Sequence, residues 1–301
     1  MSSIWLEVAL NGPWSRDRQP RIPLLADEIF DEALACADAG ASVIHFHAYH
    51  PVSRRQRDDY GIHAPIVERI RSRVDVICYP TVPFAGSVDL PQPLTAQRRF
   101  GAVEKLLQAG LIEWSALDPD STNIAHFDDI ARGKQGFVHA NPESHIRYGL
   151  ELATRYAMTP SYAIYEPGFI RLAAALHKAC AGAPMPVYRL MFSNDIGFGF
   201  PAQPWALEAY LQLLARDAPA APWMVAGLGV DIEPLIDMAV RRSGHVRVGL
   251  EDAPMGCVRD NRDLTERARR MIELAGGTLA DTAQVRAALH SVTGGGRAGD
   301  T

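Results

Sequence analysis

The sequence predicts a single (β/α)8 barrel, the TIM-barrel architecture, on three observations. Short apolar runs typical of buried strands alternate with longer amphipathic runs typical of helices. Eight such strand–helix pairs follow one another in 301 residues without a long linker, which favours one closed barrel over two domains. The alternative, a doubly wound open sheet, would be supported by a GxGxxG motif after the first strand. That motif is missing there, and Gly197-Phe198-Gly199 lies after the sixth strand without the third glycine.

The individual elements follow from local patterns. We expect strands at 4–10, 42–48, 74–79, 111–117, 161–165, 187–192, 223–226 and 245–252. We expect helices at 26–39, 61–72, 95–109, 142–157, 169–181, 202–216, 234–242 and 264–274, and a short extra helix at 281–289. Gly40 and Gly110 are placed to end the helices before them. The barrel domain is therefore expected to span residues 1–291, followed by a disordered tail at 292–301.

Composition excludes several classes of protein. A formal net charge of −5 argues against nucleic-acid binding through bulk electrostatics. No run of about 18 uncharged apolar residues suggests a membrane span, and the first residues do not resemble a signal peptide. The four cysteines are scattered without a CxxC motif, which is typical of reduced thiols. These features predict a soluble cytoplasmic protein.

Two expected strands carry residues that could hold a metal ion. His45 and His47 project to the same side of one strand, roughly 6.6–7 Å apart along it. Glu251 shares its parity with Arg247 on the last strand and could complete a site of two imidazoles and one carboxylate. The competing interpretations are two packed histidines and a buried structural Arg247–Glu251 ion pair, with Asp252 capping a turn.

Polar residues also end several other expected strands. The function of a (β/α)8 barrel resides at the carboxyl ends of its strands. Beside the proposed ligands, those ends carry Asn11, Thr81, Ser115, Arg247 and Asp252. Packing alone explains this convergence poorly, although the hydroxyls of Thr81 and Ser115 could equally bond to local backbone.

At these residues the chain resembles the beta-keto acid cleavage enzyme family. The matching segments are listed here in chain order: Ala39-Gly40-Ala41 with His45-Phe46-His47, Ser115-Ala116-Leu117-Asp118-Pro119 with Ser121 and Asn123, and Gly244 to Asp252 with Asn261. The resemblance implies a zinc-dependent barrel enzyme, a homo-oligomer and in particular a tetramer. It also implies conversion of a β-keto acid and acetyl-CoA to acetoacetate and a new CoA thioester. In that case His45, His47 and Glu251 would hold Zn²⁺, and Arg247, Asp252, Thr81 and Ser115 would match catalytic and carboxylate-binding positions.

The implied chemistry suits these residue types. Zn²⁺ would polarise the keto carbonyl as a Lewis acid. Asp252 is the candidate base for the α-proton of acetyl-CoA. Arg247 would bind a carboxylate or a developing oxyanion, and Thr81, Ser115 and Asn11 would bind substrate.

Apolar residues and arginines near the expected site bear on its specificity. Trp14 and Ala163 stand where members of the resembled family that suit an ammonium-bearing keto acid carry carboxylates, and Tyr49 stands where many members have arginine. Together with Phe84, these residues predict an uncharged or apolar substituent on the keto acid. The loops after the first two strands contain a set of arginines that are either solvated or contact the CoA phosphates: Arg16, Arg18, Arg21, Arg54, Arg55 and Arg57.

Other functions remain open at this point. An amidohydrolase-like zinc hydrolase acting on an amide or lactone also has a His-x-His pair, although on its first strand. A non-catalytic barrel that binds a ligand through Arg247 is a third interpretation. A Schiff-base aldolase is disfavoured because Lys105, Lys134 and Lys178 all fall in expected helices or connecting loops.

Overall fold

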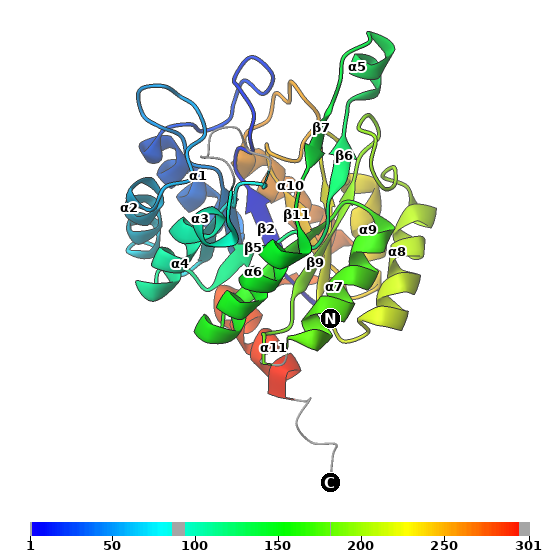
Figure 1. The fold of residues 1–301 in the computed structure, drawn as a ribbon. Coiled ribbons are helices and arrows are strands. Elements are labelled where there is room, and N and C mark those ends of the chain that lie inside the picture. The colour runs from blue at the N-terminus through cyan, green and yellow to red at the C-terminus, as the bar shows by residue number, and fades with distance from the viewer. Residues whose placement is uncertain (1, 86–93, 181, 295–301) are drawn as a thin grey trace.

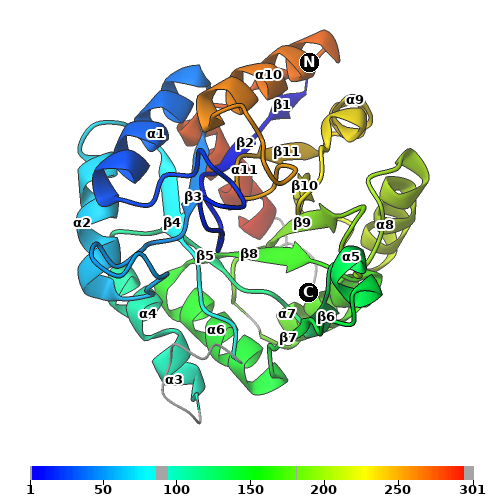
Figure 2. The same cartoon turned by 90° about the horizontal axis from the view of Figure 1, so that it is seen from above.

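Eight parallel strands form the barrel in a computed structural model that describes residues 2–85, 94–180 and 182–294. Their hydrogen-bonded order is β4-β3-β2-β11-β10-β9-β8-β5, and β5 lies beside β4 to close the ring (Figure 2). The strands are β2 (Leu6–Ala9), β3 (Val43–Phe46), β4 (Ile77–Pro80), β5 (Trp114–Ala116), β8 (Thr159–Ile164), β9 (Val187–Phe192), β10 (Trp223–Gly227) and β11 (His245–Val248). The predicted (β/α)8 barrel is confirmed.

Helices surround the strands on the outside (Figure 1). They are α1 (Ala26–Ala39), α2 (Tyr60–Arg71), α3 (Ala96–Arg99), α4 (Gly101–Gln108), α6 (Glu143–Tyr156), α7 (Pro167–Ala179), α8 (Pro204–Asp217), α9 (Glu233–Arg241) and α10 (Asn261–Leu274). The expected helix at 95–109 is divided into α3 and α4, because Phe100 buries its ring and takes φ −92° and ψ 5°. No helix in the described ranges is long and apolar enough to cross a membrane.

Strand β11 shows how the barrel sorts its side chains. Val246 and Val248 pack outward into the core between strands and helices, while Arg247 is enclosed on the inward face. The strand ends at Val248, earlier than expected, because Gly249 takes φ +133°. A Cβ at Gly249 would lie 2.1 Å from the carbonyl oxygen of Ala9, so this close approach requires glycine. Glu251 and Asp252 therefore lie in a turn after the strand.

One additional unit at the carboxyl end of the barrel was not expected from the sequence. Strands β6 (Thr122–Ile124) and β7 (Phe137–His139) pair antiparallel on either side of the short helix α5 (Phe127–Ala131). Figure 1 shows this unit projecting beyond the carboxyl ends of the barrel strands. It brings His139 back to the barrel mouth beside Asp118.

The opposite end of the barrel is closed. The expected first strand is divided at Trp5 into β2 and β1 (Ser3–Ile4), and β1 pairs with β12 (Thr278–Leu279). Helix α11 (Thr282–Gly294) packs Val285 and Leu289 against Trp5 and Trp114. This helix continues past the boundary expected at residue 291, and residues 295–301 of the predicted tail lie outside the described ranges.

Candidate active site

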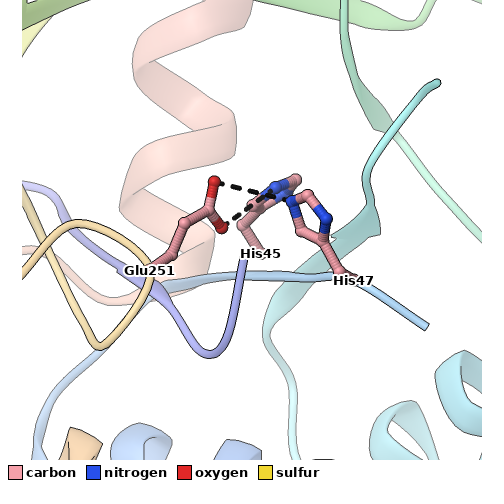
Figure 3. Close-up of side chains that lie close together, drawn as sticks. All are labelled: His45, His47 and Glu251. Carbon is pink, nitrogen blue, oxygen red and sulfur yellow. Dashed lines mark ion pairs between the residues drawn. The ribbon is translucent and has the colours of Figure 1, made fainter. Parts of the chain in front are cut away.

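The three residues predicted as metal ligands converge at the carboxyl end of the barrel (Figure 3). His45 is on β3, His47 lies just beyond it, and Glu251 follows β11. The Nε2 atoms of His45 and His47 each lie 3.5 Å from a different oxygen of Glu251. Ligands at about 2.1 Å from a tetrahedral zinc ion are separated by about 3.4 Å, so these gaps suit a metal ion better than direct hydrogen bonds.

The hydrogen bonds around these side chains leave ligand atoms free. Gln56 donates its amide N–H to Asp58, which turns its Oε1 toward Nδ1 of His47 at 2.9 Å. Nδ1 of His47 is therefore the protonated nitrogen, and Nε2 presents a lone pair to the cluster. Within the described part of the chain, Glu251 Oε2 and His45 Nδ1 are buried without a hydrogen-bond partner. Buried polar atoms are seldom left unpaired, so an unpaired carboxylate oxygen between two imidazoles fits the binding of a cation there.

The electrostatics of Glu251 and His45 also favour ligation. Burial raises the pKa of Glu251, but Arg247 and both histidines outweigh it and hold that pKa well below its ordinary value. Burial keeps the pKa of His45 well below its ordinary value, with Glu251 opposing. At His47 burial also lowers the pKa, but Glu251 and Gln56 outweigh it and leave the pKa raised. An ionised carboxylate and a neutral His45 are the forms that bind a metal.

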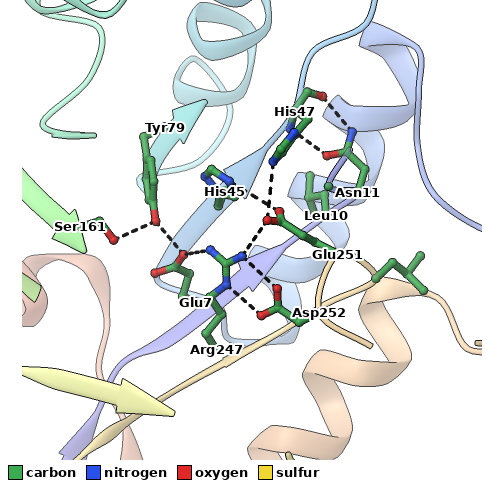
Figure 4. Close-up of polar contacts among 12 residues, drawn as sticks. Glu7, Leu10, Asn11, His45, His47, Tyr79, Ser161, Arg247, Glu251 and Asp252 are labelled. Atoms are coloured by element: carbon green, nitrogen blue, oxygen red, sulfur yellow. Dashed lines mark hydrogen bonds and ion pairs between the residues drawn. The ribbon is translucent and has the colours of Figure 1, made fainter. Parts of the chain in front are cut away.

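Arg247 organises the carboxylates next to this cluster (Figure 4). It donates from Nε and Nη2 to Asp252 at 2.8 and 2.9 Å, and from Nη1 to Glu7 at 2.9 Å. Its Nη2 also lies 3.0 Å from Glu251. These contacts occupy four of the five guanidinium N–H groups. One N–H of Arg247 therefore remains for the predicted substrate contact, and the other four hold the carboxylates of Glu7, Glu251 and Asp252.

Glu7 and Tyr79 extend this network across the barrel and were not identified as site residues from the sequence. Glu7 accepts a hydrogen bond from the Tyr79 hydroxyl at 2.7 Å, and that hydroxyl lies 3.2 Å from Oγ of Ser161. The available signal was an acid at an inward position of an otherwise apolar strand.

Two asparagines attach the ligand-bearing segments to each other. Asn11 accepts from the backbone N–H of His47 at 2.8 Å and donates to the carbonyls of His47 and Pro23. Asn261 accepts from the N–H of Leu250 and donates to the carbonyl of Leu10, each at 2.9 Å. Because the Asn11 amide is engaged in positioning His47, little of it remains for the substrate contact predicted from the sequence.

The structure corrects the assignment of Ser115 and leaves that of Thr81 open. Trp114 and Ala116 pack inside the barrel, so Ser115 between them faces the helices, and its hydroxyl donates to the Ala116 carbonyl at 3.3 Å. Thr81 follows β4 with the inward parity of Tyr79. Its contact with substrate stays a prediction.

A loop after β2 covers the His45, His47 and Glu251 cluster. Trp14 donates from its indole to the carbonyl of Glu251 at 2.8 Å, and the Tyr49 hydroxyl donates to the carbonyl of Gly12. Gly12 takes φ +63°, and a Cβ there would lie 2.6 Å from Cγ of Glu251. Trp14 and Tyr49 thus hold the loop against Glu251, a role that their sequence positions did not reveal.

A second polar cluster lies on the other wall of the mouth. Asp118, just after β5, accepts from the backbone of Ala163 at 3.1 Å and lies 3.0 Å from Nε2 of His139. Arg189, on β9, approaches Asp118 at 3.7 Å and donates to the carbonyl of Ser161 at 3.2 Å. The sequence reasoning missed Arg189, although a lone arginine in the apolar run Val187–Phe192 was a signal.

Comparison with known proteins agrees with this geometry. The model of the family described as beta-keto acid cleavage enzyme matches residues 3–290. The 3-oxoadipate:acetyl-CoA acetyltransferase of Cupriavidus necator is 26% identical over 94% of this chain and 93% of its own length. The 3-keto-5-aminohexanoate cleavage enzyme of Acetoanaerobium sticklandii is 27% identical over 90% and 92%.

Solved structures share the fold. The binary complex of ObcA with oxaloacetate superposes with a TM-score of 0.70 at 15% identity, over 90% of this chain and 67% of that one. The 3-dehydroquinate dehydratase of Geobacillus kaustophilus reaches a TM-score of 0.56 at 11% identity, over 91% of each chain. With the family model spanning nearly every residue and the ligand cluster in place, the chain belongs to the beta-keto acid cleavage enzyme family.

Proposed function

We propose that this protein is a zinc-dependent enzyme that converts a β-keto acid and acetyl-CoA to acetoacetate and a new CoA thioester. The observation that carries the proposal is the buried His45, His47 and Glu251 cluster adjoining the Arg247–Asp252 pair. The names of the relatives, several of which include acetyl-CoA or a keto acid, support the same reaction class.

A divalent ion held by His45, His47 and Glu251 would supply Lewis-acid polarisation of the keto carbonyl. Two imidazoles and one carboxylate suit zinc, and they leave open positions for substrate. The protein's part is to hold the three ligands apart at the spacing described above. Gln56 and Asn11 contribute to this by orienting the ring and the backbone of His47.

Asp252 is the group best suited to remove an α-proton of the β-keto acid, and not of acetyl-CoA as expected from the sequence, because only the keto-acid carbanion leads to acetoacetate. Its C2 would bond to the acetyl carbonyl carbon with loss of the CoA thiolate. Attack of that thiolate on the former keto carbonyl would then break the C2–C3 bond and give acetoacetate and the new CoA thioester.

Burial raises the pKa of Asp252 to about 6, with Arg247 opposing, which brings its basicity closer to neutral pH. Arg247 binds both carboxylate oxygens and so fixes the carboxylate plane, while each oxygen keeps a further lone pair for the proton. Thr81 is proposed to bind the substrate carboxylate from the neighbouring wall.

The decisive test is incubation of the purified protein with acetyl-CoA and a panel of β-keto acids, with detection of acetoacetate and determination of bound metal. We expect acetoacetate to form with stoichiometric zinc and to disappear after chelation. Release of acid from an amide or lactone without CoA would instead support the hydrolase alternative. That alternative is weakened because the histidine pair belongs to the second barrel strand, with His45 on β3 and His47 just beyond it, and because β8 and β9 carry no histidine.

Three expectations from the sequence remain predictions. The cytoplasmic location is consistent with the four free cysteines. The tetramer can be measured by analytical ultracentrifugation. Contacts between the basic loops and CoA are limited for Arg16 and Arg21, which are paired with Glu28 and Asp260.

A further inference from the structure

Arg189 and Arg247 are two buried cations inside the same barrel, but their charges are balanced differently. Arg247 lies within 3.0 Å of three carboxylates, those of Glu7, Glu251 and Asp252. Among the residues described, Arg189 has one carboxylate within 4 Å, that of Asp118 at 3.7 Å. Asp118 also accepts from the Ala163 backbone and contacts His139, so its charge is shared. Arg189 is therefore the cation with spare capacity for an anion.

The hydrogen bonds of Arg189 lead to the same conclusion. Its side chain is 5% exposed, and its Nη2 donates to the carbonyl of Ser161. Its Nε is buried and has no hydrogen-bond partner in the described ranges. A guanidinium with an unpaired buried N–H is costly unless another acceptor arrives. A carboxylate is the acceptor that matches its forked geometry best.

The strand neighbours of Arg189 supply no anion. Ala163 is its partner in the β8–β9 register, and Met224 is its partner on β10. Neither neighbour can neutralise the charge. Ala163 also belongs to an apolar cluster at the mouth with Met191 and Leu228, which could pack along a short methylene chain.

This geometry revises the substituent expected from the sequence. The prediction of an uncharged keto acid rested partly on Trp14 and Tyr49, and both are engaged in holding the loop against Glu251. It also rested on Ala163, whose small side chain is the β8 partner of Arg189. A cationic substrate remains disfavoured, but a buried arginine with an unused N–H makes an anionic end more favourable than an apolar one.

We propose that Arg189 is a specificity-determining residue that binds the distal carboxylate of a β-keto dicarboxylic acid. In this arrangement the keto group faces the His45, His47 and Glu251 cluster, and the methylene chain crosses the mouth toward β9. The inference rests on the proposed function, since it names the substrate class of that reaction.

The first test compares two six-carbon acids, 3-oxoadipate and 3-oxohexanoate, which differ in having a carboxylate or a methyl group at the distal end. We expect the wild-type enzyme to show a kcat/KM at least about 30-fold higher for the dicarboxylic acid, because a charged hydrogen-bonded contact is worth roughly 10- to 150-fold. Equal kcat/KM values, or preference for 3-oxohexanoate, would overturn the proposal.

The second test removes the charge from both members of the pair, so that Asp118 is not left buried without a cation. The double variant R189M/D118N should lose roughly 10²-fold in kcat/KM for 3-oxoadipate, mainly through KM, and change less than about threefold for 3-oxohexanoate. R267M, which removes an arginine paired with Glu233 on the outside of the barrel, is the matched control and should change neither value. Equal losses on both acids would show that Arg189 is only structural.

A binding experiment separates this inference from the proposed reaction. Calorimetric titration of the zinc-loaded protein with each acid, without acetyl-CoA, should show tighter binding of 3-oxoadipate, and R189M/D118N should abolish the difference. If no acetoacetate forms but this difference is found, the reaction is wrong and the carboxylate site stands. If acetoacetate forms and the two acids bind equally, the reaction stands and the carboxylate site is wrong.

Discussion

The two ends of strand β11 both lead to buried polar residues, but only those at the amino end have their hydrogen-bonding atoms paired. At the amino end, His245 stacks on Trp5 with ring centroids 3.9 Å apart, and its Nδ1 accepts from the Trp5 backbone at 3.2 Å. At the carboxyl end, the segment leads to Glu251, whose Oε2 has no hydrogen-bond partner among the described residues. Burial is similar at both ends, whereas hydrogen-bond satisfaction differs. The closed end stabilises the barrel, and the open end keeps lone pairs available for chemistry.

The largest effect should come from removing a carboxylate ligand at the open end. E251Q should lose at least about 10³-fold in kcat together with its zinc, because changes to outer partners alone cost 10- to 100-fold. H245Q at the closed end should keep its zinc and most of its activity. Metal analysis and turnover of both variants check this, and an E251Q enzyme with its full zinc content would contradict the assignment.

The next effect concerns two arginines at the two ends. R247M leaves three carboxylates buried without their cation and should reduce the free energy of unfolding by about 3–5 kcal/mol. R286M breaks partly exposed pairs with Glu113 and Asp75 at the closed end and should cost about 1 kcal/mol or less. Urea unfolding of both variants measures the difference, and similar losses would remove the contrast between the ends.

The pH dependence of stability should carry a contribution from His245. Burial lowers its folded pKa to about 3 from the ordinary 6.5, so the unfolded chain binds the proton more readily. The stabilisation is therefore complete above pH 6.5 and is lost as the pH falls from 6.5 toward 3, by an amount on the order of a few kcal/mol. H245Q should show a shallower loss of unfolding free energy over this range, and superimposable pH profiles would refute this role.

The smallest effect concerns Gln56, which contacts the His47 ring at the open end. Q56L removes the acceptor for Nδ1 of His47 and should weaken zinc binding by about 10- to 100-fold without unfolding the protein. Q108L removes a glutamine that contacts Tyr156 on the surface and is the matched control. Competition with a chelator measures both affinities, and equal affinities would mean that the His47 ring is oriented without Gln56.

The sequence by itself determined the barrel and the three residues of the candidate metal site. Both depend on local patterns, namely the alternation of apolar runs along the chain and the period of two that puts His45 and His47 on one side of a strand. Tertiary structure alone decided where β11 ends, because the contact of Gly249 with Ala9 joins segments far apart in the chain.

Tertiary structure likewise decided which polar residues face the site. Ser115 faces outward because the phase of β5 is set by its pairing with β8, and the bonds of Glu7, Tyr79 and Arg189 depend on the stagger between strands. Parity within one strand can be read from the sequence, whereas the height of one strand relative to the next depends on packing across the whole barrel. The three residues of the candidate metal site were therefore predictable, and the groups that position them and the proposed carboxylate site were not.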